Sequence, residues 1–174
     1  MKQNYILNIV LSLALTLGCI NGLFAQATAT ASASATIVAP ITMSKNVDMN
    51  FGNAAVSVST GGSVVLAPAG TRTAGGGGVT LPATAGTVTA ASFTVSGAPG
   101  YTFAVTLPAS AVITGPAAAT MTVSSFTSSP SATGTLSGSG TQTLTVGATL
   151  ALSAAQAPGT YTNASAVPVT VNYN

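Results

Sequence analysis

The chain is poor in charge, with no histidine, no tryptophan and a single cysteine. Beyond residue 25 its only charged residues are Lys45, Asp48 and Arg72, so this part has one carboxylate and no thiol. Paired acid–base catalysis, a serine triad and the usual metal sites need side chains that are missing here. We therefore expect no enzyme activity, no metal and no cofactor. The lack of a basic patch also argues against nucleic acid as a partner.

Two features that could suggest chemistry have simpler structural interpretations. The glycine run at residues 75–78 is not followed by the Lys and Ser/Thr of a phosphate-binding loop, so it predicts a flexible loop. Lys45 could activate a serine if its ammonium group lost a proton. Asp48 follows it closely, however, and we predict a local ion pair on a loop instead.

Residues 1–25 have the features of a secretion signal peptide, with a positive start and an apolar run at residues 6–17. This run is shorter than the about 20 residues that a membrane span needs. Cleavage after Ala25 or after Ala27 would fit. Cys19 lies within this segment and is either a lipidation site or a residue removed with the signal. We expect a secreted protein, located outside the cell or on the outer cell surface.

Residues 27–39 alternate without interruption along the segment that follows the signal. A period of two is typical of a β-strand with one buried and one wet face. At about 3.3 Å per residue the strand would span roughly 43 Å, about twice the common length. We interpret residues 26–40 as an extension that inserts into a sheet, either this chain's own or a neighbour's. Its inserted face would consist of Ala27, Ala29, Ala31, Ala33, Ala35, Ile37 and Ala39.

Short alternating runs separated by turn residues continue through residues 41–174, without an amphipathic helix. Residues 91–107 predict a hairpin whose turn lies at residues 97–100. The regular spacing of strands and turns favours a single all-β domain, an antiparallel β-sandwich, over a parallel sheet or a solenoid.

Three further strands are predicted, at residues 120–126, at residues 144–152 with a break or bend near Gly147, and at residues 167–173. Alternation along the strands also selects the side chains that should face inward. The predicted core consists of Phe93, Val95, Phe103, Val105, Leu107, Val123, Leu144, Val146, Val169 and Val171.

An ordered set of segments carries a resemblance to known proteins. It comprises residues 36–42 (TIVAPIT), 48–52 (DMNFG), 70–72 (GTR), 91–97 (ASFTVSG), 141–147 (TQTLTVG), 159–161 (GTY) and 169–173 (VTVNY). In this order they resemble a bacterial family of secreted domains of unknown function that is similar to spore coat protein U and to chaperone–usher fimbrial subunits. The resemblance implies an immunoglobulin-like, pilin-like sandwich that lacks its final strand. In such subunits the N-terminal extension of the next subunit fills the resulting groove.

Carried over to this chain, the resemblance makes residues 27–39 the donor strand. The implied partners are other copies of the chain, with a periplasmic chaperone and an outer-membrane usher as candidates. Tyr173 matches the penultimate tyrosine usual in fimbrial subunits. Two departures are the missing cysteine pair and a donor face made mostly of alanine, with Ile37 as its one large residue. The implied groove-flanking terminal strand carries Val167, Val169, Val171 and Tyr173.

Three functions remain open at this point. The first, which we favour, is a secreted structural subunit of a filament, fimbria or coat, assembled by strand donation. In the second, the N-terminal strand completes its own sandwich, giving a surface module or an adhesin that binds carbohydrate. The third is ice binding by threonine-rich faces such as Thr141, Thr143 and Thr145, although exposed threonine is ordinary in strands.

Overall fold

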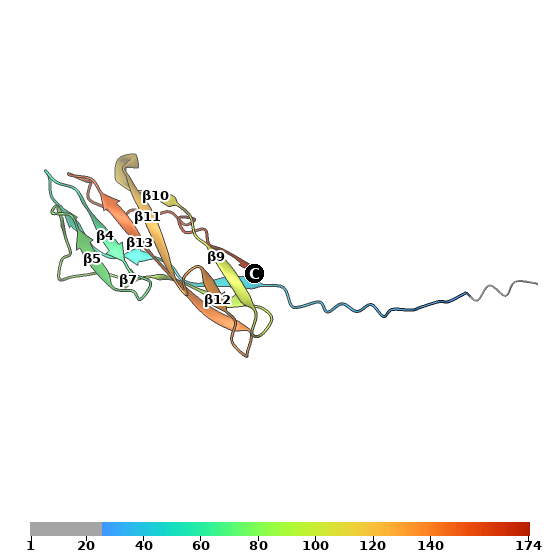
Figure 1. Ribbon diagram of the computed structural model, residues 1–174. Coiled ribbons are helices and arrows are strands. Elements are labelled where there is room, and N and C mark those ends of the chain that lie inside the picture. The colour runs from blue at the N-terminus through green and yellow to red at the C-terminus, as the bar shows by residue number, and fades with distance from the viewer. Residues whose placement is uncertain (1–25) are drawn as a thin grey trace, which may run out of the picture. The chain divides into compact units, whose positions relative to one another are not determined.

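The computed structural model describes residues 26–174, so the signal-peptide and Cys19 predictions lie outside the described residues (Figure 1). Residues from Ile37 onward form one unit, which is built of strands and one short 3₁₀ turn. No helix in residues 26–174 has the length and apolar character to cross a membrane. The elements are β1 (Thr42–Val47), β2 (Asn50–Phe51), β3 (Ala55–Val56), β4 (Gly62–Leu66), β5 (Arg72–Gly75), β6 (Val79–Thr80), β7 (Val88–Thr89), β8 (Ala91–Ser96), β9 (Thr102–Thr106), β10 (Ser110–Thr114), η1 (Pro116–Ala118), β11 (Thr120–Ser129), β12 (Thr133–Thr135), β13 (Thr141–Leu152) and β14 (Thr170–Tyr173).

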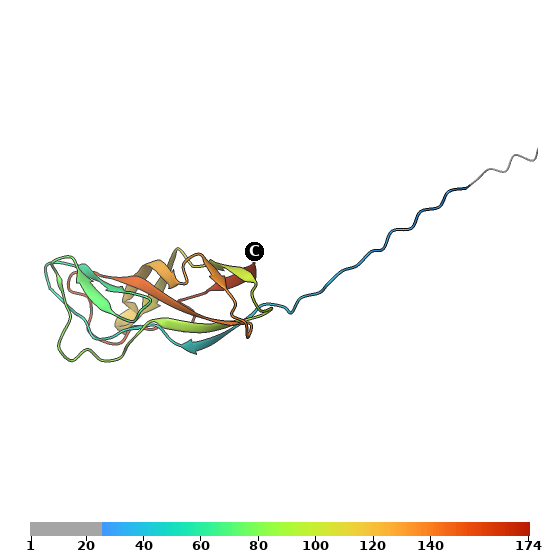
Figure 2. The same ribbon diagram turned by 60° about the horizontal axis from the view of Figure 1, so that its bottom comes forward.

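Two antiparallel sheets form the body of this unit. The larger is seven-stranded, with the order β1-β8-β13-β11-β10, and β4 also pairs with β13 while β5 pairs with β4. The smaller sheet has the order β12-β9-β14, and two-stranded ladders join β2 to β7 and β3 to β6. Figure 2 shows β14 (red) beside β9 and apart from the layer that contains β13 (orange). The predicted all-β antiparallel sandwich is confirmed.

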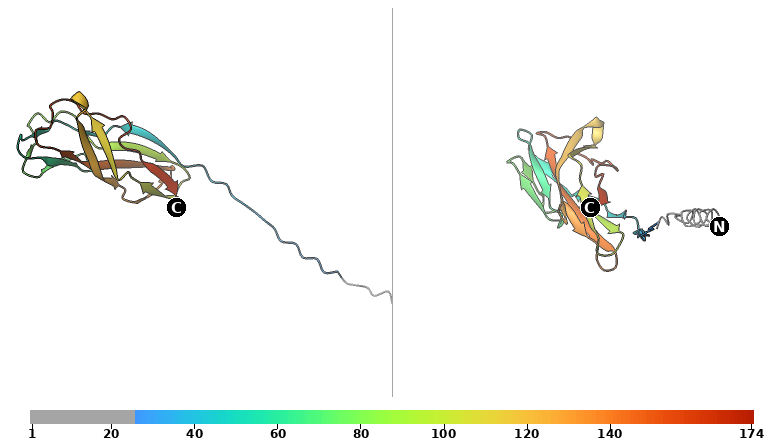
Figure 3. Two further views of the ribbon diagram at one scale, coloured as in Figure 1. Left: turned by 90° about the horizontal axis from the view of Figure 1, so that it is seen from above. Right: turned by 45° about the vertical axis from the view of Figure 1, so that its right-hand side comes forward.

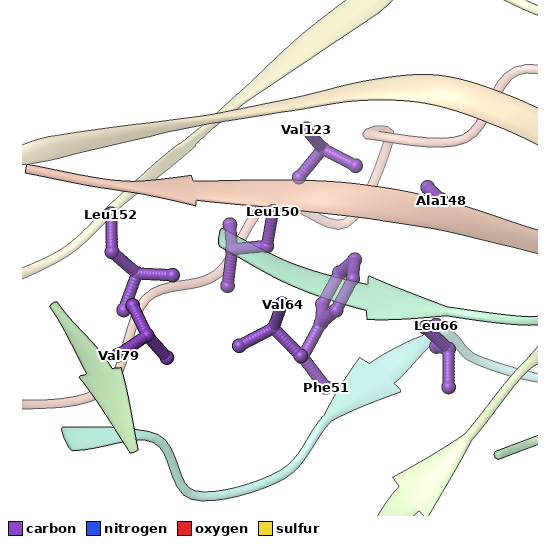
Figure 4. Packing of buried hydrophobic residues seen from close by; sticks show 8 residues of the cluster. All are labelled: Phe51, Val64, Leu66, Val79, Val123, Ala148, Leu150 and Leu152. Carbon is purple, nitrogen blue, oxygen red and sulfur yellow. The ribbon is translucent and has the colours of Figure 1, made fainter. Parts of the chain in front are cut away.

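Alternating side chains of the facing strands fill the core. Every second residue of β8 is buried, as the period-two pattern predicts. Buried residues form two clusters, and Figure 4 shows the first of them between β4, β13 and their neighbours. The first cluster comprises Phe51, Val64, Leu66, Val79, Val123, Ala148, Leu150 and Leu152. The second cluster comprises Ala91, Phe93, Val95, Phe103, Leu136, Leu144 and Val146.

The predicted core residues all belong to these clusters or pack against them. The buried members of the predicted set are Phe93, Val95, Phe103, Val123, Leu144 and Val146. The remaining four are half-buried against the second cluster, namely Val105, Leu107, Val169 and Val171. The inward face of each predicted strand was therefore correct, but the side chains of the terminal strand are less enclosed than expected.

The predicted hairpin at residues 91–107 is wrong, although both of its strands exist. β8 pairs with β1 and β13, whereas β9 pairs with β12 and β14, so the two strands belong to different sheets. The loop at residues 97–100 crosses between the sheets and bonds to residues outside both strands, with Gly97 N–H donating to Gly140 O at 2.9 Å. This crossing places Phe93 and Phe103 together in the second cluster.

The structure also bears on two glycine predictions. β13 is not broken at Gly147, but its ladder with β11 shifts register between Ser124 and Thr127, opposite this glycine. A Cβ at Gly147 would lie 2.2 Å from the Leu66 carbonyl oxygen, so the missing side chain allows a close backbone approach. The run at residues 75–78 ends β5 and turns into β6. Within it, a Cβ at Gly78 would lie 1.9 Å from the Thr60 carbonyl oxygen, so this turn packs on the neighbouring backbone.

Candidate subunit-interaction site

The alternating N-terminal segment, residues 26–40, belongs to no strand, and every one of its residues is exposed. Ile37 is 96% exposed, which is unusual for so large an aliphatic side chain in a folded protein. The segment is drawn as an extended trace in Figure 1. Its alternation is thus not used for pairing in the structure of the single chain. The exposed set includes all seven predicted donor residues, Ala27, Ala29, Ala31, Ala33, Ala35, Ile37 and Ala39.

A groove of about 960 Å³ opens along one side of the sandwich, and we call it the core groove. One rim is formed by residues 45–54, which include the end of β1 and all of β2. The other rim is formed by residues 159–164 together with Ala166 and Val167, which precede β14. These rims come from opposite ends of the domain sequence, so no local pattern could have brought them together.

The floor of the core groove is the hydrophobic core itself. Phe93, from the second cluster, and Val123, from the first, both line the groove. The groove therefore reaches residues of both core clusters between the two rims. The floor consists of Ala91, Phe93, Ile113, Met121, Val123, Leu150 and Leu152.

The terminal strand is shorter than predicted but keeps the predicted face. Strand pairing covers only Thr170–Tyr173, where β14 pairs with β9, and Pro168 lies just before it. Of the predicted groove-flanking residues, Val167 lines the core groove, whereas the other three do not. All four predicted side chains are half-buried against the second cluster, namely Val167, Val169, Val171 and Tyr173.

Two edge strands bear unused backbone groups. In the part of the chain that the structure describes, β1 pairs only with β8 and β14 pairs only with β9. Each strand therefore has a second edge with no ladder. An open edge of this kind can pair with an added strand from another segment or molecule.

Arg72 holds the first rim of the core groove in place. Its guanidinium Nη1 donates hydrogen bonds to the carbonyl oxygens of Phe51, at 2.5 Å, and Asn53, at 2.7 Å. Gly52, between them, has a positive φ of 68°, and a Cβ there would lie 2.8 Å from Arg72 Nη1. No local sequence pattern indicates this role, because the two carbonyls belong to residues far from Arg72 in the chain.

Replacing Arg72 with methionine should lower the free energy of unfolding by about 1.5 to 3 kcal/mol, because two carbonyls lose a charged donor. Chemical denaturation measures this loss, and faster amide exchange should be confined to residues 50–54. Lys45→Met is the matched control, since the exposed Lys45–Asp48 pair contributes about 0 to 1 kcal/mol. If Arg72→Met lowers the free energy of unfolding no more than the control does, Arg72 does not hold the first rim in place.

The two charged side chains on the first rim form an ion pair with each other. Lys45 Nζ lies 2.6 Å from Asp48 Oδ1, which confirms the predicted ion pair, although Lys45 lies in β1 and not on a loop. Both side chains are largely exposed, at 55% and 78%. An uncharged segment could therefore enter the core groove without leaving either charge unpaired.

Hydrogen bonds of side chains shape the second rim. The Tyr161 hydroxyl accepts a hydrogen bond from Gln156 Nε2 at 2.9 Å and donates one to the Ala157 carbonyl at 2.8 Å. Asn163 Nδ2 donates to the Val112 carbonyl at 2.8 Å, which ties this rim to β10. The second rim is thus a loop that hydrogen bonds tie to β10 and to the turn before it.

These features define an antiparallel β-sandwich with a groove lined by residues of its core. A family model described as "Domain of unknown function (DUF4402)" matches residues 41–173, and the chain belongs to this family. The match covers both sheets and both rims of the core groove, and it begins just after the exposed N-terminal segment. No curated protein and no solved structure matches the chain.

Proposed function

We propose that the mature protein is a secreted structural subunit of a surface filament, fimbria or coat. Its N-terminal segment, residues 26–40, inserts as a strand into the core groove of a neighbouring copy. The observation that carries this proposal is the pairing of two complementary features within one chain. The groove is lined by residues of both core clusters, and the segment is patterned as a strand yet exposed along its whole length.

The composition of the segment supports this fit. Its alanine face would lie on the apolar floor, while the serine and threonine face would lie toward solvent between the polar rims. Each alanine contributes little, since a buried CH₂ is worth about 0.8 kcal/mol. The long segment offsets this weakness, because main-chain hydrogen bonds to an open strand edge such as that of β1 accumulate along its length.

The scarcity of charge also supports assembly. Beyond residue 25 the chain carries one acidic and two basic residues, so little electrostatic repulsion keeps copies apart. We extend the proposal to a functional similarity with spore coat protein U and chaperone–usher fimbrial subunits. On this view the partners include a periplasmic chaperone and an outer-membrane usher, and the assembled protein lies on the outer cell surface.

The proposal predicts that assembly depends on both concentration and residues 26–39. Mature protein should form filaments or oligomers in electron microscopy and sedimentation, whereas protein lacking residues 26–39 should remain monomeric and folded. The denaturation midpoint of the mature protein should rise across about a hundredfold range of concentration, because association stabilises the folded state. The midpoint of the truncated protein should stay constant.

A mature protein that sediments only as a monomer, with a midpoint independent of concentration, would contradict the proposal. That result would favour the alternative in which the N-terminal strand completes its own sandwich. Oligomers of equal size with and without residues 26–39 would contradict strand donation specifically. Adding the truncated protein to the mature protein supplies a further check, because truncated copies can receive a strand but cannot donate one and should shorten the assemblies.

A further inference from the structure

Tyr173 joins three parts of the domain at the point where the N-terminal segment ends and β1 follows. Its hydroxyl accepts a hydrogen bond from the Ala98 N–H at 2.7 Å and donates one to the Ala39 carbonyl at 2.9 Å. Its ring packs edge-on against Tyr101, with ring centroids 5.7 Å apart. Figure 3 shows the end of β14 beside the start of β1. We call Tyr173, Ala98 and Ala39 the Tyr173 junction.

The position of the hydroxyl is fixed by its surroundings. A Cβ at Gly97 would lie 2.2 Å from the Tyr173 hydroxyl oxygen, so only glycine leaves room for it. The backbone of Gly97 is itself held by its hydrogen bond to the Gly140 carbonyl. The Ala39 carbonyl is therefore bound to a rigid part of the fold.

The chain is also held immediately after Pro40. Ile41 packs against the second cluster, and Thr42 begins β1 opposite Ser96. Proline has a fixed φ and restricts the residue before it to extended conformations. The backbone from Ala39 to Thr42 is thus anchored at both ends.

A segment that paired with its own domain along β1 would have to reverse direction near these residues. The tightest reversal is a β-turn with Pro40 in its second position, and in its closed form the Ala39 carbonyl accepts the Thr42 amide N–H. In the structure this carbonyl instead accepts the Tyr173 hydroxyl, and Thr42 lies in the β1 ladder. Ile37 and Val38, just upstream, are β-branched and favour extended backbone over a turn.

We infer that the Tyr173 junction disfavours the chain reversal that pairing with its own domain requires, so that the acceptor of the N-terminal segment is a second copy of this chain. The inference rests on the proposed function and adds a positioning residue to it. Tyr173 does not contact the incoming strand in this scheme. It sets the balance between pairing within one chain and pairing between chains.

Tyr173→Phe tests this role because it keeps the ring and removes only the hydroxyl. Monomers isolated from this variant should contain self-inserted chains, in which the amides of residues 27–39 exchange about tenfold more slowly than in wild-type monomers. The assembled fraction should fall severalfold. Tyr101→Phe is the matched control, since its hydroxyl takes part in neither junction hydrogen bond, and it should behave like the wild type.

A second variant keeps the junction intact. Inserting Gly-Ser-Gly-Ser between Val38 and Ala39 allows a reversal upstream of the junction and should likewise yield protected monomers. If the amide protons of residues 27–39 exchange fast in both variants, the inference is wrong. Slow exchange of these amides in wild-type monomers would also overturn it. A wild-type protein that never assembles, with exposed segments, would instead contradict the proposed function.

Discussion

Replacing Ile37 with aspartate is expected to abolish assembly while leaving the monomer folded. Ile37 is the one large side chain on the donor face, and it is 96% exposed in the single chain. Insertion would bury the new carboxylate without a partner, at a cost of about 3 to 5 kcal/mol. A loss of about 3 kcal/mol corresponds to roughly a hundredfold weaker association. Sedimentation measures the association, and chemical denaturation at low concentration checks that the monomer is unchanged.

Thr36→Asp is the matched control for this experiment. It places the same charge on the neighbouring residue, whose side chain would lie on the wet face of the inserted strand. Assembly of Thr36→Asp should stay within severalfold of the wild type. Equal losses in the two variants would show that charge on the segment matters rather than its face. A monomer destabilised by Ile37→Asp at every concentration would instead favour pairing within one chain.

Replacing Phe103 with alanine should lower the free energy of unfolding by about 3 to 5 kcal/mol. Phe103 is 0% exposed, and its ring fills the space over Gly134, where a Cβ would lie 2.3 Å from the ring. The substitution leaves a cavity in the second cluster that the flanking strands of both sheets cannot close. Denaturation in urea, at concentrations where the protein is monomeric, measures the effect.

Val112→Ala provides the comparison, because Val112 is 48% exposed on β10 and its truncation should cost less than about 0.5 kcal/mol. A Phe103→Ala loss below about 1 kcal/mol would mean that β9 does not contribute its side chains to the shared core in solution.

The strands and their inward faces could be predicted from the sequence because a period of two is a local property. Alternation in β8 and β13 selected Val95 and Leu144, both fully buried. The same alternation continues along residues 27–39, where no burial accompanies it in the single chain. Periodicity therefore identifies a face that is suited to burial, but it does not identify what covers that face.

The pairing of strands could not be predicted in the same way. The glycine and proline at residues 97–100 are equally compatible with a hairpin and with a crossing between sheets, since both reverse the chain within a few residues. The difference depends on long-range contacts such as the hydrogen bond from Leu136 N–H to the Tyr101 carbonyl. The core groove escaped prediction for the same reason, because residues 45–54 and 159–167 meet only after both sheets have formed.

The direction of β13 has a consequence for how the molecule can be modified. The start of β13 pairs with the end of β8, near the Tyr173 junction, whereas its final residue, Leu152, pairs with Gly62 at the opposite end of the strand. The loop at residues 57–61 therefore lies at the end remote from the junction, and Val58 within it is 83% exposed. Foreign epitopes, tags or dyes placed there would be presented once per copy without obstructing the N-terminal segment. Substitutions and insertions in this loop should be tolerated for the same reason, so the sequences of related chains should diverge most there.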